Sequence, residues 1–277
     1  MSKMTARVAF QGERGAYSEA AAVVFAPHAE PLPCRLLSDV FDAVAAGRAE
    51  LGVVPIDNSQ AGSINEAYDL LLAHALHITG EHDQRIRHCL LALPGRRLEG
   101  LRRVFSHPQA LAQCDAFLRA HELEGVPAYD TAGSAKLVAK QRLKDAGAIA
   151  GAHAAAIYGL QVLAEGIETN PANYTKFLSV AREPAVHRRP AKTSVVFTTA
   201  NVPGALYRVL GALASRSINM TKLESRPGRT VPWEYVFYAD VEGHAEDPHV
   251  AAALREVTQM CTFFRLLGSY LRATPLP

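Results

Sequence analysis

Five consecutive residues, Asn173–Phe177, bring together side chains that can do chemistry. Their sequence is NYTKF, and alternate side chains of an extended segment point to opposite faces. Thr175 and Phe177 would then share one face, and Lys176 would point to the other. A positioned hydroxyl can donate a proton or a hydrogen bond to a departing oxygen. The alternative is a loop that enters an ordinary structural strand.

The elements before this segment place helix starts next to strand ends. Short apolar strands, such as Arg7–Gln11 and Leu51–Pro55, alternate with amphipathic helices, which is typical of a parallel α/β architecture. Further buried strands are predicted at Cys89–Leu93, Arg103–Phe105 and Ala148–Gly151. Helix N-termini carry unpaired N–H groups and partial positive charge, so we expect an anionic ligand near these turns. Ser106 and Gln109 have the spacing of a capping box at one such helix start.

Residues 182–191 mark a change of pattern. They contain two prolines and three arginines without apolar periodicity, which indicates a linker. Beyond it the predicted order is strand, helix, strand, strand, helix, strand, with strands at Thr193–Thr199, Ile218–Ser225, Trp233–Val241 and Thr262–Leu267. A βαββαβ order in about 80 residues predicts a small ferredoxin-like sandwich.

The composition argues against several classes of function. The formal net charge is +2 with scattered Lys and Arg, so we expect neither nucleic acid nor an anionic membrane as a partner. No apolar run reaches the roughly 20 residues of a membrane helix, and the N-terminus lacks the apolar stretch of a signal peptide. The four cysteines lie far apart, which disfavours zinc and redox chemistry. We therefore expect a cytoplasmic protein.

Five strings of residues in series resemble the motifs of the prephenate dehydratase family. They are GERGAYSEAA at Gly12–Ala21, PIDNSQAGSI at Pro55–Ile64, SHPQALAQC at Ser106–Cys114, AAAIYGL at Ala154–Leu160, and NYTKF. Their order and spacing extend over almost all of residues 7–181. The resemblance implies a two-lobed α/β catalytic domain with the fold of the periplasmic solute-binding proteins.

The resemblance also implies a reaction, the conversion of prephenate to phenylpyruvate. Prephenate carries two carboxylates and a ring hydroxyl, and loss of carbon dioxide and that hydroxyl makes the ring aromatic. The site must hold two anions, orient the ring and help hydroxide to leave, so we expect no cofactor and no metal. Thr175 matches the family's essential threonine, and we expect it to protonate or hydrogen-bond the leaving hydroxyl.

Other residues match family positions that bind the substrate. They are Asn58, Ser59, Ser106, His107, Gln109, Asn173, Lys176 and Phe177. Several have a purely structural alternative: Gln109 can close a capping box with Ser106, and Phe177 can pack in the core. His107 can be a surface or packing residue at a helix start.

Two residues depart from the family pattern. Lys176 stands where the family usually has arginine, and Asp57 stands where it usually has glutamate. Lysine keeps the charge but loses the planar two-pronged contact with a carboxylate. Aspartate keeps the acid with a side chain that is one methylene shorter. Both changes bear on substrate choice more than on the type of reaction.

The C-terminal region resembles an ACT domain of the phenylalanine-binding type. The matching strings are PGALYRVL at Pro203–Leu210 and ESRP at Glu224–Pro227. The resemblance implies that L-phenylalanine binds as an allosteric feedback inhibitor through Asn201, Gly204, Ala205, Leu206, Glu224, Ser225, Arg226 and Pro227. The alternative for Glu224 and Arg226 is an ion pair on the surface. ACT domains act in pairs, so the resemblance also implies a homo-oligomer, either a dimer or a tetramer.

These inferences combine into one domain plan. We predict a catalytic domain at 1–182, with lobes at about 1–82 plus 165–181 and at 83–164, and an ACT domain at 192–273. Three alternatives stay open: arogenate as the substrate, a decarboxylase that leaves the ring non-aromatic, and a non-catalytic sensor that keeps the cleft and the ACT domain. The presence of Thr175 argues against the second and third.

Overall fold

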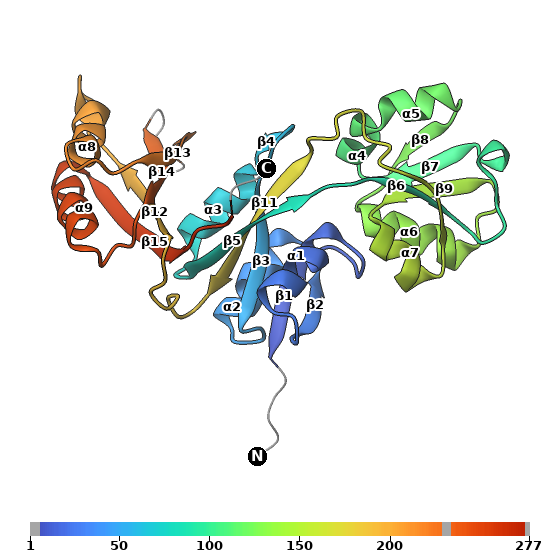
Figure 1. Cartoon of the computed structure of the whole chain (residues 1–277), viewed down its shortest axis with the longest axis horizontal. Coiled ribbons are helices and arrows are strands. Elements are labelled where there is room, and N and C mark those ends of the chain that lie inside the picture. The colour runs from blue at the N-terminus through green and yellow to red at the C-terminus, as the bar shows by residue number, and fades with distance from the viewer. Residues whose placement is uncertain (1–5, 229–233, 275–277) are drawn as a thin grey trace, which may run out of the picture. The chain divides into compact units, whose positions relative to one another are not determined.

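The computed structural model describes residues 6–228 and 234–274, and the chain divides into two compact units. The first unit contains residues up to Leu70 together with His82–Leu178. The second contains Leu71–Glu81 together with the chain from Ser179 onward. Three sheets, which can be followed in Figure 1, organise these units. None of the described helices is both long and apolar enough to cross a membrane.

The first sheet has the strand order β2–β1–β3–β11–β5, with the short β4 paired to β3. The strands are β1 (Arg7–Gln11), β2 (Glu30–Cys34), β3 (Leu51–Asn58), β4 (Gly62–Ser63), β5 (His77–Arg85) and β11 (Tyr174–Ala181). Its helices are α1 (Tyr17–Phe25), α2 (Leu37–Ala45) and α3 (Asn65–Ala73). Because β1 runs parallel to both β2 and β3, the carboxyl ends of these three strands meet at one edge of the sheet.

The second sheet has the order β10–β6–β9–β7–β8. Its strands are β6 (Cys89–Ala92), β7 (Arg103–Ser106), β8 (Glu124–Pro127), β9 (Ala146–Ala150) and β10 (Gln161–Glu165). Its helices are η1 (Leu98–Gly100), α4 (Pro108–Gln113), α5 (Asp115–Ala120), α6 (Thr131–Gln141) and α7 (Ala152–Tyr158). Strand β7 is parallel to β8 and β9, whereas β6 is antiparallel to β9 and β10.

Strand β6 shows why this second sheet is covered on both faces. Leu90 belongs to a buried cluster with Ala110 of α4, whereas the next residue, Leu91, belongs to another buried cluster with Val138 of α6. Successive side chains of a strand point to opposite faces, so an all-apolar strand needs a helix layer on each side. These layers position the starts of α4 and α6, which both border the candidate active site described below.

The third sheet is antiparallel, with the order β13–β14–β12–β15. Its elements are β12 (Ala191–Thr198), α8 (Ala205–Ala214), β13 (Met220–Pro227), β14 (Tyr235–Glu242), α9 (Pro248–Met260) and β15 (Phe263–Leu271). Val195 and Val241 of the sheet share one buried core with Val209 of α8 and Val257 of α9, so both helices pack on the same face. The predicted βαββαβ order is confirmed. Trp233, where we predicted the third strand to begin, lies outside the described residues.

The predicted fold class, a mixed α/β chain with a C-terminal ferredoxin-like domain, is also confirmed. The first strand has the predicted bounds, Arg7–Gln11. The next predicted strand, Leu51–Pro55, continues to Asn58 because Asp57 and Asn58 pair with β4. This extension carries Asn58 to the end of β3, where its side chain becomes part of the polar centre described below.

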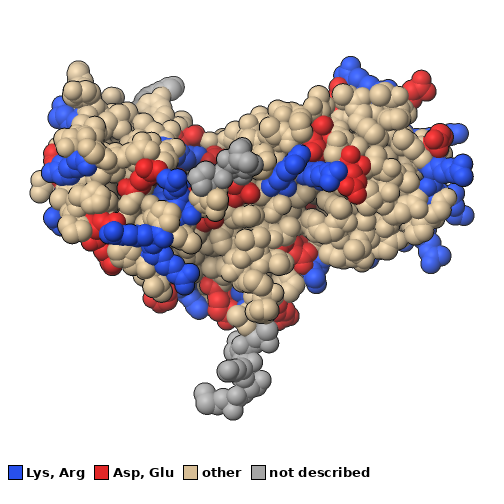
Figure 2. All heavy atoms as spheres, in the orientation of Figure 1, with Lys and Arg blue, Asp and Glu red and all other residues tan. Residues whose placement is uncertain are grey.

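The ion pair of Lys192 with Glu81 lies away from solvent. Acidic and basic side chains are interspersed over the face that Figure 2 shows, but these two residues are 7% and 8% exposed. Lys192 Nζ lies 2.6 Å from Glu81 Oε2, and Glu81 Oε1 accepts a hydrogen bond of 3.0 Å from the backbone N–H of Ala273. Within the second unit, the pair therefore joins β5 to β12 and to the chain beyond β15.

Replacing Lys192 by alanine should destabilise the protein strongly. The Glu81 carboxylate would stay buried without its cation, which typically costs about 3–5 kcal/mol of unfolding free energy. Urea denaturation followed by circular dichroism measures the loss. The exposed Arg188 provides the control, since Arg188→Ala should change the free energy by less than about 0.5 kcal/mol. Equal stability of the two variants would contradict the role of the pair.

Candidate active site

A cavity of about 160 Å³ in the first unit lies beside Thr175. Thr175 and Phe177 of β11 border it together, as the predicted alternation requires, and Asn58 of β3 lies beside them. His107 and Gln109, at the start of α4, also border it. The other lining residues are Tyr17, Ile86, His88, Ala110, Gln113, Asp130 and Thr131. Both sheets of the first unit thus contribute to the cavity.

A second cavity of about 720 Å³ shares Tyr17, His107, Asp130 and Thr131 with the first. It is bordered by the start of helix α1, where Ala16 is the N-cap residue and makes no side-chain cap. Arg35 also borders it. A helix N-terminus and a guanidinium both favour negative charge, so this cavity suits a carboxylate.

Two acidic residues that line the larger cavity already have partners. Glu13 Oε2 lies 2.7 Å from Lys136 Nζ, and this hydrogen bond lowers the pKa of Glu13 below its ordinary value. Asp130 is the N-cap residue of α6 and accepts hydrogen bonds from the backbone N–H groups of Glu13 and Gly133, at 3.0 and 3.2 Å. Their charge is therefore partly offset, and an anionic ligand meets less repulsion there.

The orientation of the Asn58 amide is fixed by the backbone. Asn58 Oδ1 accepts from the backbone N–H groups of Gln60 and Ala61 at 3.1 and 2.9 Å. These groups are obligate donors, so the oxygen must face them and Nδ2 must face the other way. Nδ2 lies 3.1 Å from the carbonyl oxygen of Tyr174, an obligate acceptor, which agrees with this assignment.

The same amide nitrogen of Asn58 holds the hydroxyl of Thr175. Asn58 Nδ2 lies 3.0 Å from Thr175 Oγ1 and 2.9 Å from Asn173 Oδ1. An amide N–H can only donate, so Thr175 Oγ1 accepts this hydrogen bond. The hydroxyl hydrogen of Thr175 is thereby left for a ligand in the cavity. A hydrogen bond to Oγ1 also stabilises the oxygen as it gives up a proton.

The chain of hydrogen bonds continues from Asn173 to His88. Since Asn173 Oδ1 faces Asn58, its Nδ2 donates to Gln113 Oε1 at 3.0 Å. His88 Nε2 lies 2.9 Å from the same oxygen, so Nε2 must carry the proton. A backbone contact at one end of this series of hydrogen bonds, at Asn58, thus determines the tautomer of His88 at the other end.

The far end of this chain is buried. His88 is 2% exposed, and its backbone N–H donates to Glu168 Oε2 at 2.8 Å. Its Nδ1 lies 3.2 Å from the hydroxyl oxygen of Tyr17, whose single hydrogen is donated to the carbonyl of Arg87 at 2.8 Å. Burial lowers the pKa of His88, so the ring is held in its neutral form near neutral pH.

Three of the predicted substrate-binding residues make other contacts. Ser106 is fully buried and donates to the carbonyl of Ile149 at 2.7 Å. Ser59 exchanges hydrogen bonds with the backbone at Ala172 and Tyr174. Lys176 points away from Thr175, and its Nζ lies 2.6 Å from Asp83 Oδ1 on β5. None of the three lines either cavity.

The predicted capping box of Ser106 with Gln109 is wrong. Helix α4 begins at Pro108, so His107 is its N-cap residue, and His107 Nδ1 accepts from the backbone N–H of Gln109 at 3.3 Å. Proline at the first helical position shifts the start by one residue. The side chain of Gln109 is consequently directed elsewhere, and its Nε2 lies 3.5 Å from Asn58 Oδ1.

His88, Gln113 and Tyr17 are members of the polar centre that sequence reasoning missed. Gln109 and Gln113 are four residues apart with only apolar residues between them, and an i,i+4 polar pair on an otherwise apolar helix was the available signal. His88 directly precedes the apolar strand Cys89–Ala92, which offers no periodic clue. Its partners come from distant segments, so only the fold brings them together.

The predicted effector residues divide into two groups. Asn201, Gly204, Ala205 and Leu206 line a cavity of about 320 Å³ in the second unit, together with Thr199, Ala200, Val202, Tyr207, Glu234, Tyr235 and Phe237. Gly204 has a positive φ of 76°, which favours glycine at the start of α8. Glu224, Ser225, Arg226 and Pro227 lie on β13, which contributes no residue to this cavity.

Because burial lowers the pKa of His88, the free energy of unfolding should depend on pH. Because the folded pKa of His88 is lowered, the unfolded chain binds its proton more readily, and His88 costs stability as the pH falls below about 6.5. His88→Gln, which keeps a donor toward Gln113, should lose less stability than the unaltered chain between about pH 7 and pH 5. Urea midpoints at both pH values measure this. The exposed His28→Gln is the control, and equal losses in both variants would contradict the assignment.

Comparisons with known proteins identify the family of both regions. The family model described as prephenate dehydratase matches residues 8–185, and the ACT domain model matches residues 193–259. Arogenate dehydratase 2 of Petunia hybrida is 47% identical over 280 residues, which cover 95% of this chain and 71% of that protein.

Two solved structures are similar over nearly the whole chain. Prephenate dehydratase from Arthrobacter aurescens in complex with L-Phe is 35% identical with a TM-score of 0.89, covering 98% of this chain and 92% of that one. GqqA, described as a novel type of quorum quenching acylase, is 40% identical with a TM-score of 0.89, covering 97% and 98%. The dehydratase match includes Asn58 and Thr175, and it takes in well over half of the sequence. The chain therefore belongs to the prephenate dehydratase family and carries an ACT domain after the dehydratase region.

Proposed function

We propose that this protein is a prephenate dehydratase that forms phenylpyruvate and is inhibited by L-phenylalanine. The observation that carries the proposal is the hydroxyl of Thr175, which accepts from Asn58 Nδ2 at 3.0 Å beside a cavity. This arrangement leaves the hydroxyl hydrogen of Thr175 available to a ligand bound in the cavity. Membership of the family supplies the reaction, a dehydration with loss of carbon dioxide.

The reaction balances with one proton donor. The bond from the ring to its carboxylate breaks and carbon dioxide leaves, while the electron pair enters the ring. The carbon–oxygen bond on the opposite ring carbon breaks, and the departing hydroxide takes a proton to become water. The products are phenylpyruvate, carbon dioxide and water. Aromatisation drives the reaction, so the protein chiefly has to orient the ring and stabilise the leaving oxygen.

Each part of the site has a matching task. Thr175 donates to the leaving hydroxyl, and Asn58 orients Thr175 and stabilises its oxygen. Phe177 packs in a buried cluster with Phe10 and also borders the same cavity, so it contributes apolar surface there for the substrate ring. Gln109 and His107 border it too and can hydrogen-bond a carboxylate. The start of α1 and Arg35 supply a place for the second carboxylate in the adjoining cavity.

Four of the predicted substrate-binding residues position the site in this proposal and do not contact the substrate. They are Ser59, Ser106, Asn173 and Lys176. Asn173 is fully buried and bridges Asn58 to Gln113. Lys176 adjoins Thr175 in sequence, and its ion pair with Asp83 anchors β11 to β5. A direct contact of Lys176 with the substrate would require this 2.6 Å pair to open. We therefore assign Lys176 to holding the strand that carries Thr175.

Arogenate is the alternative substrate, and the Petunia hybrida relative favours it by its name. Arogenate differs from prephenate by an amino group in place of the keto oxygen, at the end of the molecule that does not react. Discrimination then depends on the residues that hold that side chain. Parallel assays with both substrates decide between them: prephenate gives phenylpyruvate, and arogenate gives phenylalanine.

An acylase activity is a second candidate, on the likeness to GqqA. Hydrolysis of an amide requires a nucleophile or water activated by a base. The hydrogen-bond partner of the Thr175 hydroxyl is the amide of Asn58, and an amide is not a base. The dehydratase needs only a positioned donor at Thr175, so it fits this contact better.

For regulation we propose that L-phenylalanine binds in the second unit and that the active form is a homo-oligomer. The cavity beside the start of α8 has the size of an amino acid site and is lined by Asn201, Gly204, Ala205 and Leu206. Apolar residues on the strands of this domain are exposed, namely Leu223, Tyr235, Phe263, Leu266 and Leu271. Burial of such residues against a second copy would stabilise a dimer and bring β13 to the effector.

Removing the hydroxyl of Thr175 should abolish most of the turnover. Thr175→Ala is expected to lower kcat for prephenate on the order of 10²–10³-fold, because one positioned donor at a developing charge is lost. Thr175→Ser keeps the hydroxyl and should retain far more activity. Phenylpyruvate is followed by its ultraviolet absorbance in alkali, and circular dichroism checks the fold. Near-normal turnover by the alanine variant would remove Thr175 from the mechanism.

Phenylalanine should inhibit the unaltered protein, and a change in the effector cavity should weaken that inhibition. Asn201→Ala removes a polar side chain from the cavity and is expected to raise the half-inhibitory phenylalanine concentration about five- to tenfold. The ratio of inhibited to uninhibited turnover is measured for each variant. Gln259→Ala, on the exposed side of α9, is the control and should keep the original sensitivity. Identical inhibition curves for all three proteins would place the effector elsewhere.

A further inference from the structure

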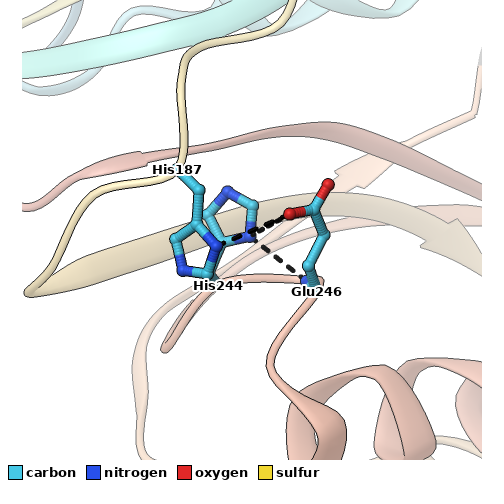
Figure 3. Close-up of side chains that lie close together, drawn as sticks. All are labelled: His187, His244 and Glu246. Carbon is cyan, nitrogen blue, oxygen red and sulfur yellow. Dashed lines mark hydrogen bonds and ion pairs between the residues drawn. The ribbon is translucent and has the colours of Figure 1, made fainter.

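His187, His244 and Glu246 lie close together in the second unit, and none of them lines a cavity described above. His187 belongs to the segment between β11 and β12, and His244 and Glu246 belong to the loop between β14 and α9. Figure 3 shows the two imidazole rings stacked on each other, with the carboxylate of Glu246 beside them. The proposed dehydratase chemistry uses none of these residues.

Three potential ligand atoms lie near one another in this group. Glu246 Oε2 lies 3.5 Å from His187 Nδ1 and 3.8 Å from His244 Nδ1. Zinc ligands at about 2.0–2.1 Å in a tetrahedron are separated from one another by about 3.3–3.4 Å. Both observed distances are slightly longer, and all three ligand atoms lie within 4.8 Å of one another, so small side-chain rotations would bring them to a tetrahedral metal site with a fourth position for water.

Neighbouring groups contact both histidines. The rings stack with centroids 3.8 Å apart and an interplanar angle of 13°. Asp247 Oδ2 accepts from the backbone N–H of His244 at 3.0 Å, and Asp247 Oδ1 lies 3.6 Å from His187 Nε2 and contacts Arg189. A carboxylate behind the second ring nitrogen of a histidine is a common support for a metal ligand, because it leaves the other nitrogen free to coordinate.

The donor set favours some metals over others. Two imidazole nitrogens and one carboxylate oxygen suit Zn²⁺, Co²⁺, Ni²⁺ and Cu²⁺, whereas Ca²⁺ and Mg²⁺ prefer all-oxygen sites. Coordination requires two local changes. His244 Nδ1 must give up the hydrogen bond of 3.2 Å that it accepts from the backbone N–H of Glu246. The stacked rings must also turn about their side-chain bonds until both lone pairs meet at one point.

We propose that His187, His244 and Glu246 bind one divalent transition-metal ion, with Zn²⁺ as the best fit. The metal would join the segment that precedes β12 to the loop that precedes α9. The metal would thus link the segment that leads into the ACT domain to the ACT domain itself. This site is independent of the proposed dehydratase activity, and its test does not use that activity.

The test is metal binding by the full chain, purified without a polyhistidine tag and treated with a chelator. Calorimetric titration with Zn²⁺ should give one site per chain, and Co²⁺ should give the visible absorption of a tetrahedral centre. Zn²⁺ should also raise the melting temperature, because it binds the folded state. His244→Ala and Glu246→Gln are each expected to weaken Zn²⁺ binding by at least about tenfold.

Controls separate this site from general surface binding. His28→Ala removes an exposed histidine elsewhere and should bind Zn²⁺ as the unaltered chain does. Glu246 is itself exposed, so Glu246→Gln should fold normally and keeps the test valid if His244→Ala does not. The absence of saturable binding would overturn the proposal. Equal affinity in the Glu246→Gln, His244→Ala and unaltered proteins would overturn it as well.

Discussion

The polar centre of the first unit depends on which way a single side-chain amide points. The backbone N–H groups of Gln60 and Ala61 can only donate, so they hold Asn58 Oδ1 and turn Nδ2 toward β11. Each later hydrogen bond follows from that choice, through Thr175 on one branch and through Asn173 and Gln113 to His88 on the other. Buried polar groups without partners are costly, so the chain holds one arrangement.

The second unit is organised by a different constraint. Lys192 and Glu81 are both removed from water, and each compensates the charge of the other. Glu81 lies on β5, two residues before Asp83, which pairs with Lys176 next to Thr175. The same strand thus carries one partner of an ion pair in each unit. The proposed inhibition by phenylalanine requires only that phenylalanine bind two states of the protein unequally.

Much of the fold was predictable because it follows from local pattern. Alternating apolar strands and amphipathic helices indicated the α/β region, and the βαββαβ order indicated the sandwich that the structure has. Predictions failed where a single turn decides the outcome. Pro108 sets the start of α4 one residue later than a capping box from Ser106 would, so Ser106 serves the core while His107 caps the helix. The pairing of β4 with β3 was equally invisible in the local pattern.

The sequence by itself determined the family, the order of elements in the C-terminal domain, and the placement of Thr175 and Phe177 on one face, because motifs and side-chain alternation are local properties. Only the tertiary structure decided that Asn58 reaches Thr175, that Lys176 pairs with Asp83, and that His88 joins the polar centre. Those contacts join residues far apart in the chain, and their directions depend on which groups can donate. Spacing along a sequence carries no information about either. The first two contacts arise when β3, β11 and β5 become neighbours in one sheet, and the His88 contact arises when Gln113 of α4 meets Asn173.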